Sequence, residues 1–224
     1  MSFDLVGLGT ILKVIYSHKK DRDRFIREDV SKQIKKEQGL KTSSGGDFYV
    51  PFWADAKGHV SGALDLDVAT RGRVAVNRKH KGRLYPILAK SFLLWWNEKR
   101  RLRNVPIRVI DERLTAKYVV EDNGTIKIEN TLSLIVGDEG RRLIYPYFCE
   151  NPSLSEEAAR IALCLMSASI NSYEPSEMRV LDVIAGKSFS ILDLPLEGNE
   201  KDLFHTQYGA LMADWKKEKA KQEE

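Results

Sequence analysis

The segment that most constrains the fold is residues 84–103, a long apolar stretch that ends in a cluster of positive charge. Its apolar side chains recur three and four residues apart, as they do on one face of a helix. The residues that define and widen this face are Leu84, Tyr85, Ile87, Leu88, Phe92, Leu94, Trp95 and Leu102. Pro86 falls in the first turn, where a missing amide hydrogen costs little. A helix with so broad an apolar face is predicted to lie in the core.

The composition is that of a soluble globular protein. The 224 residues are 42% hydrophobic and 30% charged, which is enough to build one substantial core. Residues 3–16 are apolar but contain Asp4 and Lys13, so we expect neither a signal peptide nor a membrane span, and we predict a cytoplasmic protein. Cys149 and Cys164 lack the paired spacing of zinc or redox motifs and are expected to be buried, reduced thiols.

The first half of the chain is predicted to be helical. Apolar periodicity favours helices over residues 3–15 and 19–41, a break at 42–47, and further helices over 51–60 and 65–76. A basic loop at 77–83 then leads into the helix that begins at Leu84. We divide the chain into an N-terminal helical arm, residues 1–46, and a single α+β domain, residues 47–224. Within that domain, residues 47–104 are expected to be helical, 105–192 rich in strands, and 200–219 a C-terminal helix.

The second half changes to an alternating pattern. It predicts strands over 105–120, 125–136, 143–148, 178–184 and 189–192. Asp122-Asn123-Gly124 predicts a hairpin turn, and Pro146 favours an edge strand or a strand end. Ser155 is a suitable N-cap for a helix between these strands, and the tail from Lys216 is expected to be frayed. The predicted fold class is α+β, with a helical N-terminal half packed on a small mixed or antiparallel sheet that has flanking helices.

Charge divides the chain into two unlike halves. Residues 1–104 hold 22 Lys and Arg against 11 Asp and Glu, a net charge of +11. Residues 105–224 hold 14 against 21, a net charge of −7. Such asymmetry fits a front half that meets a polyanion, and it fits equally well two halves that attract one another or a second subunit.

Ten basic residues are the candidate nucleic-acid-binding set. They are Arg71, Arg73, Arg78, Lys79, Lys81, Arg83, Lys99, Arg100, Arg101 and Arg103, and they bracket the two ends of the predicted 84–103 helix. Such side chains bind phosphates without reading sequence, and His80 and Trp96 lie near them as stacking groups. The alternative is that the two groups, about 30 Å apart along the helix, act separately as solvated ends or as partners for the acidic half.

Motifs for common cofactors are absent from the sequence. Gly186-Lys187-Ser188 lacks the first glycine of a phosphate loop, and Gly7 and Gly9 are not expected to follow a strand. The four histidines are dispersed, so we predict no metal and no cofactor. Asp182, in an otherwise apolar strand, is expected to pair with an arginine, the alternative being a functional acid.

Two resemblances add to this reading. From Leu84 to Ile191 the order helix, three strands, helix, strand resembles the core of the PD-(D/E)XK (RecB-like) nucleases. That family holds magnesium with acids on one strand and an acid-x-lysine on the next. Glu129 matches the first acid, but Tyr145-Pro146-Tyr147 stands at the second position, which implies a degenerate site. Residues 51–57 (PFWADAK), 95–101 (WWNEKRR) and 145–148 (YPYF) resemble a family of short uncharacterised bacterial proteins, which implies no mechanism.

Three functions are therefore expected in turn. The first is a non-enzymatic binding protein that acts through a protein partner or self-association, with no membrane contact. Its contact surface would be a polar sheet face or the aromatic patch of Phe48, Tyr49, Phe52 and Trp53. The second is a nucleic-acid-binding protein that uses the ten basic residues. The third is a divergent nuclease, with Glu112, Glu129 and Asp138 as its candidate catalytic acids.

Overall fold

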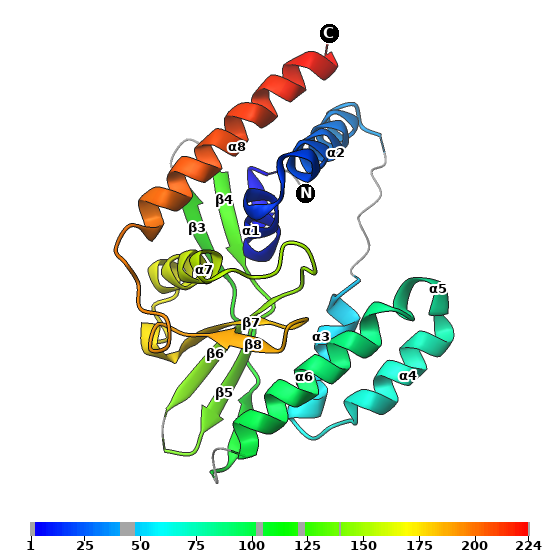
Figure 1. Cartoon of the computed structure of the whole chain (residues 1–224), viewed down its shortest axis with the longest axis vertical. Coiled ribbons are helices and arrows are strands. Elements are labelled where there is room, and N and C mark those ends of the chain that lie inside the picture. The colour runs from blue at the N-terminus through cyan, green and yellow to red at the C-terminus, as the bar shows by residue number, and fades with distance from the viewer. Residues whose placement is uncertain (1–2, 41–47, 102–104, 121–123, 139, 224) are drawn as a thin grey trace.

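The structure is a computed structural model that describes residues 3–40, 48–101, 105–120, 124–138 and 140–223, with the backbone alone for residues 99–101. Eight α-helices and two sheets make up this described part, so the predicted α+β class is confirmed (Figure 1). The helices are α1 (Leu8–Tyr16), α2 (Lys19–Glu37), α3 (Val50–Val60), α4 (Leu66–Val76), α5 (Arg78–Lys81), α6 (Leu84–Arg101), α7 (Glu156–Ser169) and α8 (Glu200–Glu223). A short 3-10 helix, Pro175–Glu177, precedes the seventh strand.

The strands form a small sheet and a larger one. They are β1 (Leu5–Gly7), β2 (Ile107–Ile110), β3 (Ala116–Val120), β4 (Gly124–Ile128), β5 (Leu132–Val136), β6 (Arg141–Tyr147), β7 (Met178–Asp182) and β8 (Lys187–Phe189). The small sheet has the order β1-β4-β3, in which β1 runs parallel to β4. The larger sheet has the order β2-β5-β6-β7-β8, and β6 and β7 are parallel because α7 crosses between them.

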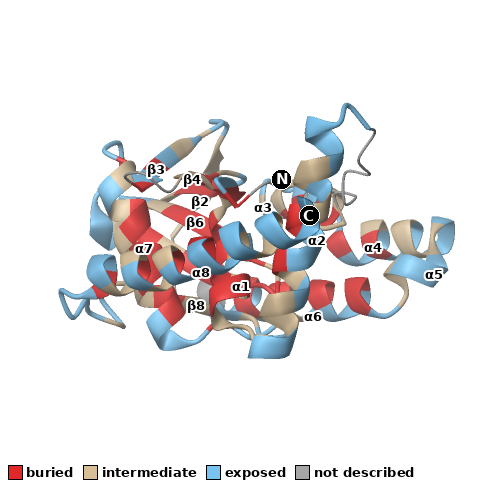
Figure 2. Ribbon diagram, turned by 90° about the horizontal axis from the view of Figure 1, so that it is seen from above, coloured by how far each residue is buried: buried red, intermediate tan, exposed pale blue. Residues whose placement is uncertain are grey.

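Helices cover both faces of the larger sheet. Along β6 the side chains of Leu143 and Ile144 point to opposite faces and belong to different clusters of buried residues. The first cluster joins one face to α1, α7, α8 and the small sheet, and the second joins the other face to α3, α4 and α6. Buried residues lie along α7, α1 and the strands, whereas α5 is not buried (Figure 2). The two clusters meet only across the sheet, so the helices of each stand apart at its edge (Figure 1).

The predicted core helix α6 is confirmed, although its buried face is narrower than expected. Phe92 is fully buried and Trp95 is 5% exposed, while Leu94 is 63% and Ile87 39% exposed. The helix that is buried on nearly every side is instead α7, whose buried residues are Ala158, Ala159, Ile161, Ala162, Leu163, Leu165 and Met166. Ser155 caps α7 as predicted, since its hydroxyl accepts from the Ala158 amide at 3.2 Å.

Two of the predicted strands are wrong, because each is two strands in different sheets. Residues 105–120 contain β2 and β3, and residues 125–136 contain β4 and β5. In the second case the chain turns at Asn130, whose φ is 63°. The apolar residues before and after this turn all have even numbers, which is why the alternation reads as one strand.

Several boundaries are corrected in the same way. Residues 3–15 are not one helix, because β1 precedes α1, and the basic loop 77–83 contains α5. Strand β6 is a central strand, although its pairing with β5 ends at Ile144, two residues before Pro146. The tail is not frayed: α8 continues to Glu223, and the Lys219 ammonium lies 2.9 Å from the Glu37 carboxylate of α2.

The division into an arm of residues 1–46 and a domain of residues 47–224 stays a prediction. The described part of residues 1–46 packs closely against later segments. Strand β1 pairs with β4, and the buried Asp29 accepts from the Trp215 indole of α8 at 3.0 Å. Among the described residues, no helix combines the length and apolar character that a membrane crossing needs.

Candidate functional site

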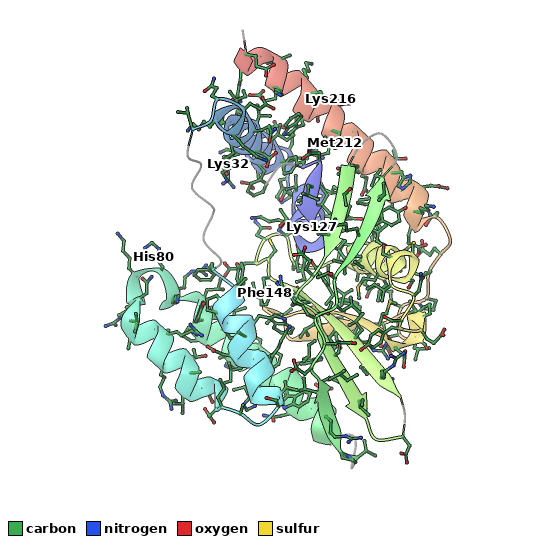
Figure 3. The ribbon with its side chains drawn as sticks, turned by 180° about the vertical axis from the view of Figure 1, so that it is seen from behind. Lys32, His80, Lys127, Phe148, Met212 and Lys216 are labelled. Atoms are coloured by element: carbon green, nitrogen blue, oxygen red, sulfur yellow. The ribbon has the colours of Figure 1, made fainter. Side chains whose placement is uncertain are left out.

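The largest hollow of the described structure lies between α1 and α2 on one side and α3 on the other. It has a volume of about 780 Å³, and its floor is formed by the residues after β4 and by the end of β6 with the loop that follows. We call it the α1–α3 cleft. Its charged lining residues are Lys13, Asp21, Arg24, Lys57, Lys127, Glu129 and Glu150. Lys127 and Phe148 lie in its middle part, with Lys32 of α2 and His80 of α5 on opposite sides (Figure 3).

The pairing of β1 with β4 places two lysines in this cleft. In the parallel register Gly7 lies opposite Lys127, so the start of α1 and the end of β4 are neighbours. Lys13, in the last turn of α1, holds its ammonium 4.4 Å from the centre of the Phe25 ring. Lys127 lies 3.9 Å from the Glu129 carboxylate, a distance at which a part-exposed pair contributes little.

Helix α3 supplies the third lysine from the opposite wall. The Trp53 indole donates a hydrogen bond to the backbone oxygen of Asn130, which fixes α3 against the loop between β4 and β5. One turn later Lys57 is half-buried, with its ammonium 5.9 Å from the Trp53 ring. Burial lowers the pKa of Lys57, because a partly desolvated ammonium loses hydration. Within the described part of the chain, neither Lys57 nor Lys13 forms an ion pair with a carboxylate.

Aromatic side chains line the cleft beside these cations. Tyr49 and Phe148 are stacked, with ring centres 4.8 Å apart and an interplanar angle of 14°. Tyr145 is almost covered, and its hydroxyl accepts from the Gly9 amide at 2.7 Å. Burial raises the pKa of Tyr145 to about 12, so this phenol is neutral at physiological pH. The lining therefore combines positive charge with planar apolar surface.

The start of α1 corrects one expectation. A strand, β1, does precede Gly7 and Gly9, contrary to the prediction. A side chain at position 9 would bring its Cβ to 3.3 Å from the Tyr145 hydroxyl, so glycine permits this close approach. The third glycine of a dinucleotide fingerprint is still missing, since Leu12 occupies that position and is buried in the core.

The candidate catalytic acids do not gather into one site. Glu112 and Glu129 line a second hollow of about 680 Å³ that shares Lys57 and Asn130 with the α1–α3 cleft. Glu112 accepts a hydrogen bond from the Tyr173 hydroxyl, while Asp138 lies beyond the opposite end of β5 from Glu129. Among the described residues, no three His, Cys, Asp or Glu side chains are placed to hold a metal ion.

The ten basic residues are divided by α6 into two separate groups. In the first group Arg73 pairs with the buried Asp55, and Arg83 donates twice to Glu150, at 2.7 Å each. Arg71, Arg78 and Lys79 are exposed, and the Lys81 ammonium lies 5.2 Å from the Tyr85 ring. The side chains of Lys99, Arg100, Arg101 and Arg103 lie outside the described residues. Because α6 is 18 residues long, the groups are about 27 Å apart.

The aromatic patch proposed as a contact surface is mostly internal. Phe52 is fully buried and Trp53 is 3% exposed, while Phe48 and Tyr49 are half-buried. The Tyr85 hydroxyl of α6 donates to the Phe48 carbonyl at 2.7 Å, which draws this segment into the second cluster of buried residues. The four residues therefore do not form an open patch.

Asp182 is satisfied by backbone amides rather than by an arginine, which corrects the prediction. It is 2% exposed and accepts from Leu154, Ile184 and Ala185 at 3.1, 3.0 and 2.9 Å. The bond from Leu154 ties the loop after β6, which lines the α1–α3 cleft, to the end of β7. Asp182 is thus a structural acid behind the cleft. Residue Lys187 begins β8 as expected, so the phosphate-loop reading gains no support.

Sequence reasoning missed the lysines of the cleft. Lys13, Lys57 and Lys127 belong to three elements far apart in the chain, and none has a local motif around it. Their convergence follows from strand pairing and helix packing. Both cysteines are free; Cys149 is buried as predicted, but Cys164 is only half-buried. No family model and no curated protein matches this chain, so both resemblances stay predictions.

Proposed function

We propose that this protein binds nucleic acid in the α1–α3 cleft, through its phosphate backbone. The observation that carries the proposal is the convergence of Lys13, Lys57 and Lys127 from separate elements in one cleft. Two of these ammonium groups have no carboxylate partner among the described residues, so their charge is available to a ligand. A phosphate oxygen provides the charge-assisted acceptor that such groups lack.

The charge around the cleft supports a polyanion. Helices α1, α2 and α3 all belong to residues 1–104, which carry a net charge of +11. Arg83 extends the positive surface to the rim, because its partner Glu150 lines the cleft. Beyond it, the exposed Arg78 and Lys79 of α5 provide further cations. Long-range attraction of this kind favours a ligand that carries many phosphates over one with a single charge.

The other two expected functions have less support. The aromatic patch that would receive a protein partner is largely buried, as described above. The acids of the proposed nuclease site lie on different sides of β5, and Glu112 is already hydrogen-bonded to Tyr173. Binding without cleavage is therefore the function that the cleft fits best.

The experiment is a titration of labelled single-stranded and double-stranded oligonucleotides at several salt concentrations, read by fluorescence anisotropy. Affinity is expected to fall as salt rises, with a log–log slope that reflects about 0.7 to 0.9 released counterions per phosphate contact. Replacement of Lys13, Lys57 or Lys127 by Ala is expected to reduce the slope by about 0.7 to 0.9 each.

The matched controls are Lys90→Ala on α6 and Lys201→Ala on α8, both exposed and away from the cleft. They remove the same charge from the protein but are expected to leave the slope unchanged. Equal losses in control and cleft variants would show that net charge alone is responsible, and would overturn the assignment of the cleft.

A further inference from the structure

The α1–α3 cleft offers planar aromatic surface together with its cations. Tyr49 and Phe148 form a stacked pair that is half-buried, so part of each ring remains accessible in the lining. Trp53 and Tyr145 also line the cleft, but they are 3% and 7% exposed, so their faces are covered by protein. No hydrogen bond of the Tyr49 hydroxyl occurs within the described residues, and its ring is the aromatic contribution of the segment just before α3.

We infer that the ligand of the cleft is a single strand, with one base stacked against the Tyr49–Phe148 pair and the flanking phosphates on Lys57 and Lys127. This inference rests on the proposed function and specifies which nucleic acid that function concerns. Any base has a flat face that stacks on an aromatic ring, so such a site accepts many sequences. Positive charge beside exposed aromatic rings is the combination that single-strand-binding grooves use.

A duplex does not fit this arrangement. Its bases cover one another's faces, so the aromatic pair would gain nothing from it unless a base left the stack. The cleft volume of about 780 Å³ is that of a pocket for a small ligand, which suits a few linked nucleotides. A double helix could reach only the cations at the rim, such as Arg78 and Lys79.

Charge placement fits a strand that runs across the cleft. Lys57 lies on the α3 wall, the same wall as Tyr49, whereas Lys127 lies at the end of β4 on the floor. The third cation, Lys13, is on the α1 wall, above the ring of Phe25. The aromatic pair is thus accompanied by cations on more than one side, so a base placed on it has phosphate partners on either side of its sugar.

The test compares three ligands on the unchanged protein: a short oligothymidylate, the same length of duplex, and a strand of the same length whose central nucleotides are abasic. All three carry the backbone phosphates, but the abasic strand cannot stack. We expect the oligothymidylate to bind about tenfold more tightly than the abasic strand, since one stacked base accounts for a factor of that order. The duplex is expected to bind more weakly than the oligothymidylate at equal salt.

Two variants assign the stacking to Tyr49. Tyr49→Leu retains an apolar side chain but has no ring, and it is expected to bind the oligothymidylate no better than the abasic strand. Tyr49→Phe keeps the ring and is expected to bind as the unchanged protein does. Circular dichroism of both variants establishes that they are folded, and the ligand comparison on the unchanged protein does not depend on them.

The failure of this inference is distinguishable from the failure of the proposed function. Salt-dependent binding that is equal for all three ligands would overturn the single-strand assignment and leave phosphate binding in place. If none of the three ligands binds in a salt-dependent way, both proposals are wrong. Equal affinities for Tyr49→Leu and Tyr49→Phe would remove Tyr49 from the site.

Discussion

Replacement of Asp182 tests how the loop beneath the α1–α3 cleft is held. Its carboxylate accepts three backbone hydrogen bonds, one on Oδ2 from Leu154 and two on Oδ1 from Ile184 and Ala185. In Asp182→Asn, one oxygen can keep its two donors, but the amide nitrogen then faces the Leu154 N–H. In Asp182→Ala all three donors lose their acceptor. The structure therefore predicts a graded loss of stability.

The magnitudes follow from the number of donors left unpaired. One buried unsatisfied amide costs about 1–3 kcal/mol, so we expect Asp182→Asn to lower the free energy of unfolding by about that amount. The Ile184 and Ala185 amides are only partly buried, and water can reach them in part. Asp182→Ala is therefore expected to cost about 3–5 kcal/mol rather than three times the single loss. For a chain of this length the melting temperature falls by about 2–4 °C per kcal/mol.

The assay is urea unfolding followed by tryptophan fluorescence, with amide hydrogen exchange at Leu154 as a local readout. Exchange of the Leu154 amide is expected to be faster in both variants, because its acceptor is lost in each. Asp214→Asn, at an exposed position of α8, is the matched control and is expected to change stability by less than about 0.5 kcal/mol. An Ala variant as stable as the Asn variant, or unchanged exchange at Leu154, would refute the reasoning.

Two further predictions concern the core and the cleft. Phe92 is fully buried, with ring centres 5.9 Å from Trp53 and 5.5 Å from Trp95, so Phe92→Ala is expected to cost about 3–5 kcal/mol in urea unfolding, against less than about 0.5 kcal/mol for the exposed Leu94→Ala. Burial lowers the pKa of Lys57, and a bound phosphate favours its charged form. Affinity for an oligonucleotide should therefore fall as pH rises through that lowered pKa, and Lys57→Arg, which stays charged, should remove this part of the pH dependence; an unchanged profile would contradict the role of Lys57.

Local signals predicted the helices well because capping and periodicity act within a few residues. Ser155 caps α7, and Asp65 caps α4 by accepting from the Val68 amide at 2.8 Å. The same local view failed at Asn130. The apolar alternation there keeps its parity across the turn, and no local signal showed that Ile128 and Leu132 belong to different sheets.

The candidate site was predictable only in its chemistry. The excess of positive charge in residues 1–104 pointed to a polyanion, but the ten residues chosen for it are split by α6 and partly paired within the protein. Pairs such as Arg83 with Glu150 join positions far apart in the chain, so their neutralisation is invisible in the sequence. Conversely, the lysines that do line the cleft are single basic residues with no neighbouring cluster.

The sequence by itself determined the α+β class, the helices with clear caps and the electrical division of the chain, because these depend on residue type and on short-range spacing. Tertiary structure decided the rest. The parallel pairing of β1 with β4 and the packing of α3 on the opposite side bring Lys13, Lys57 and Lys127 together. Such convergence depends on contacts between residues distant in the chain, which carry no periodic signal along it.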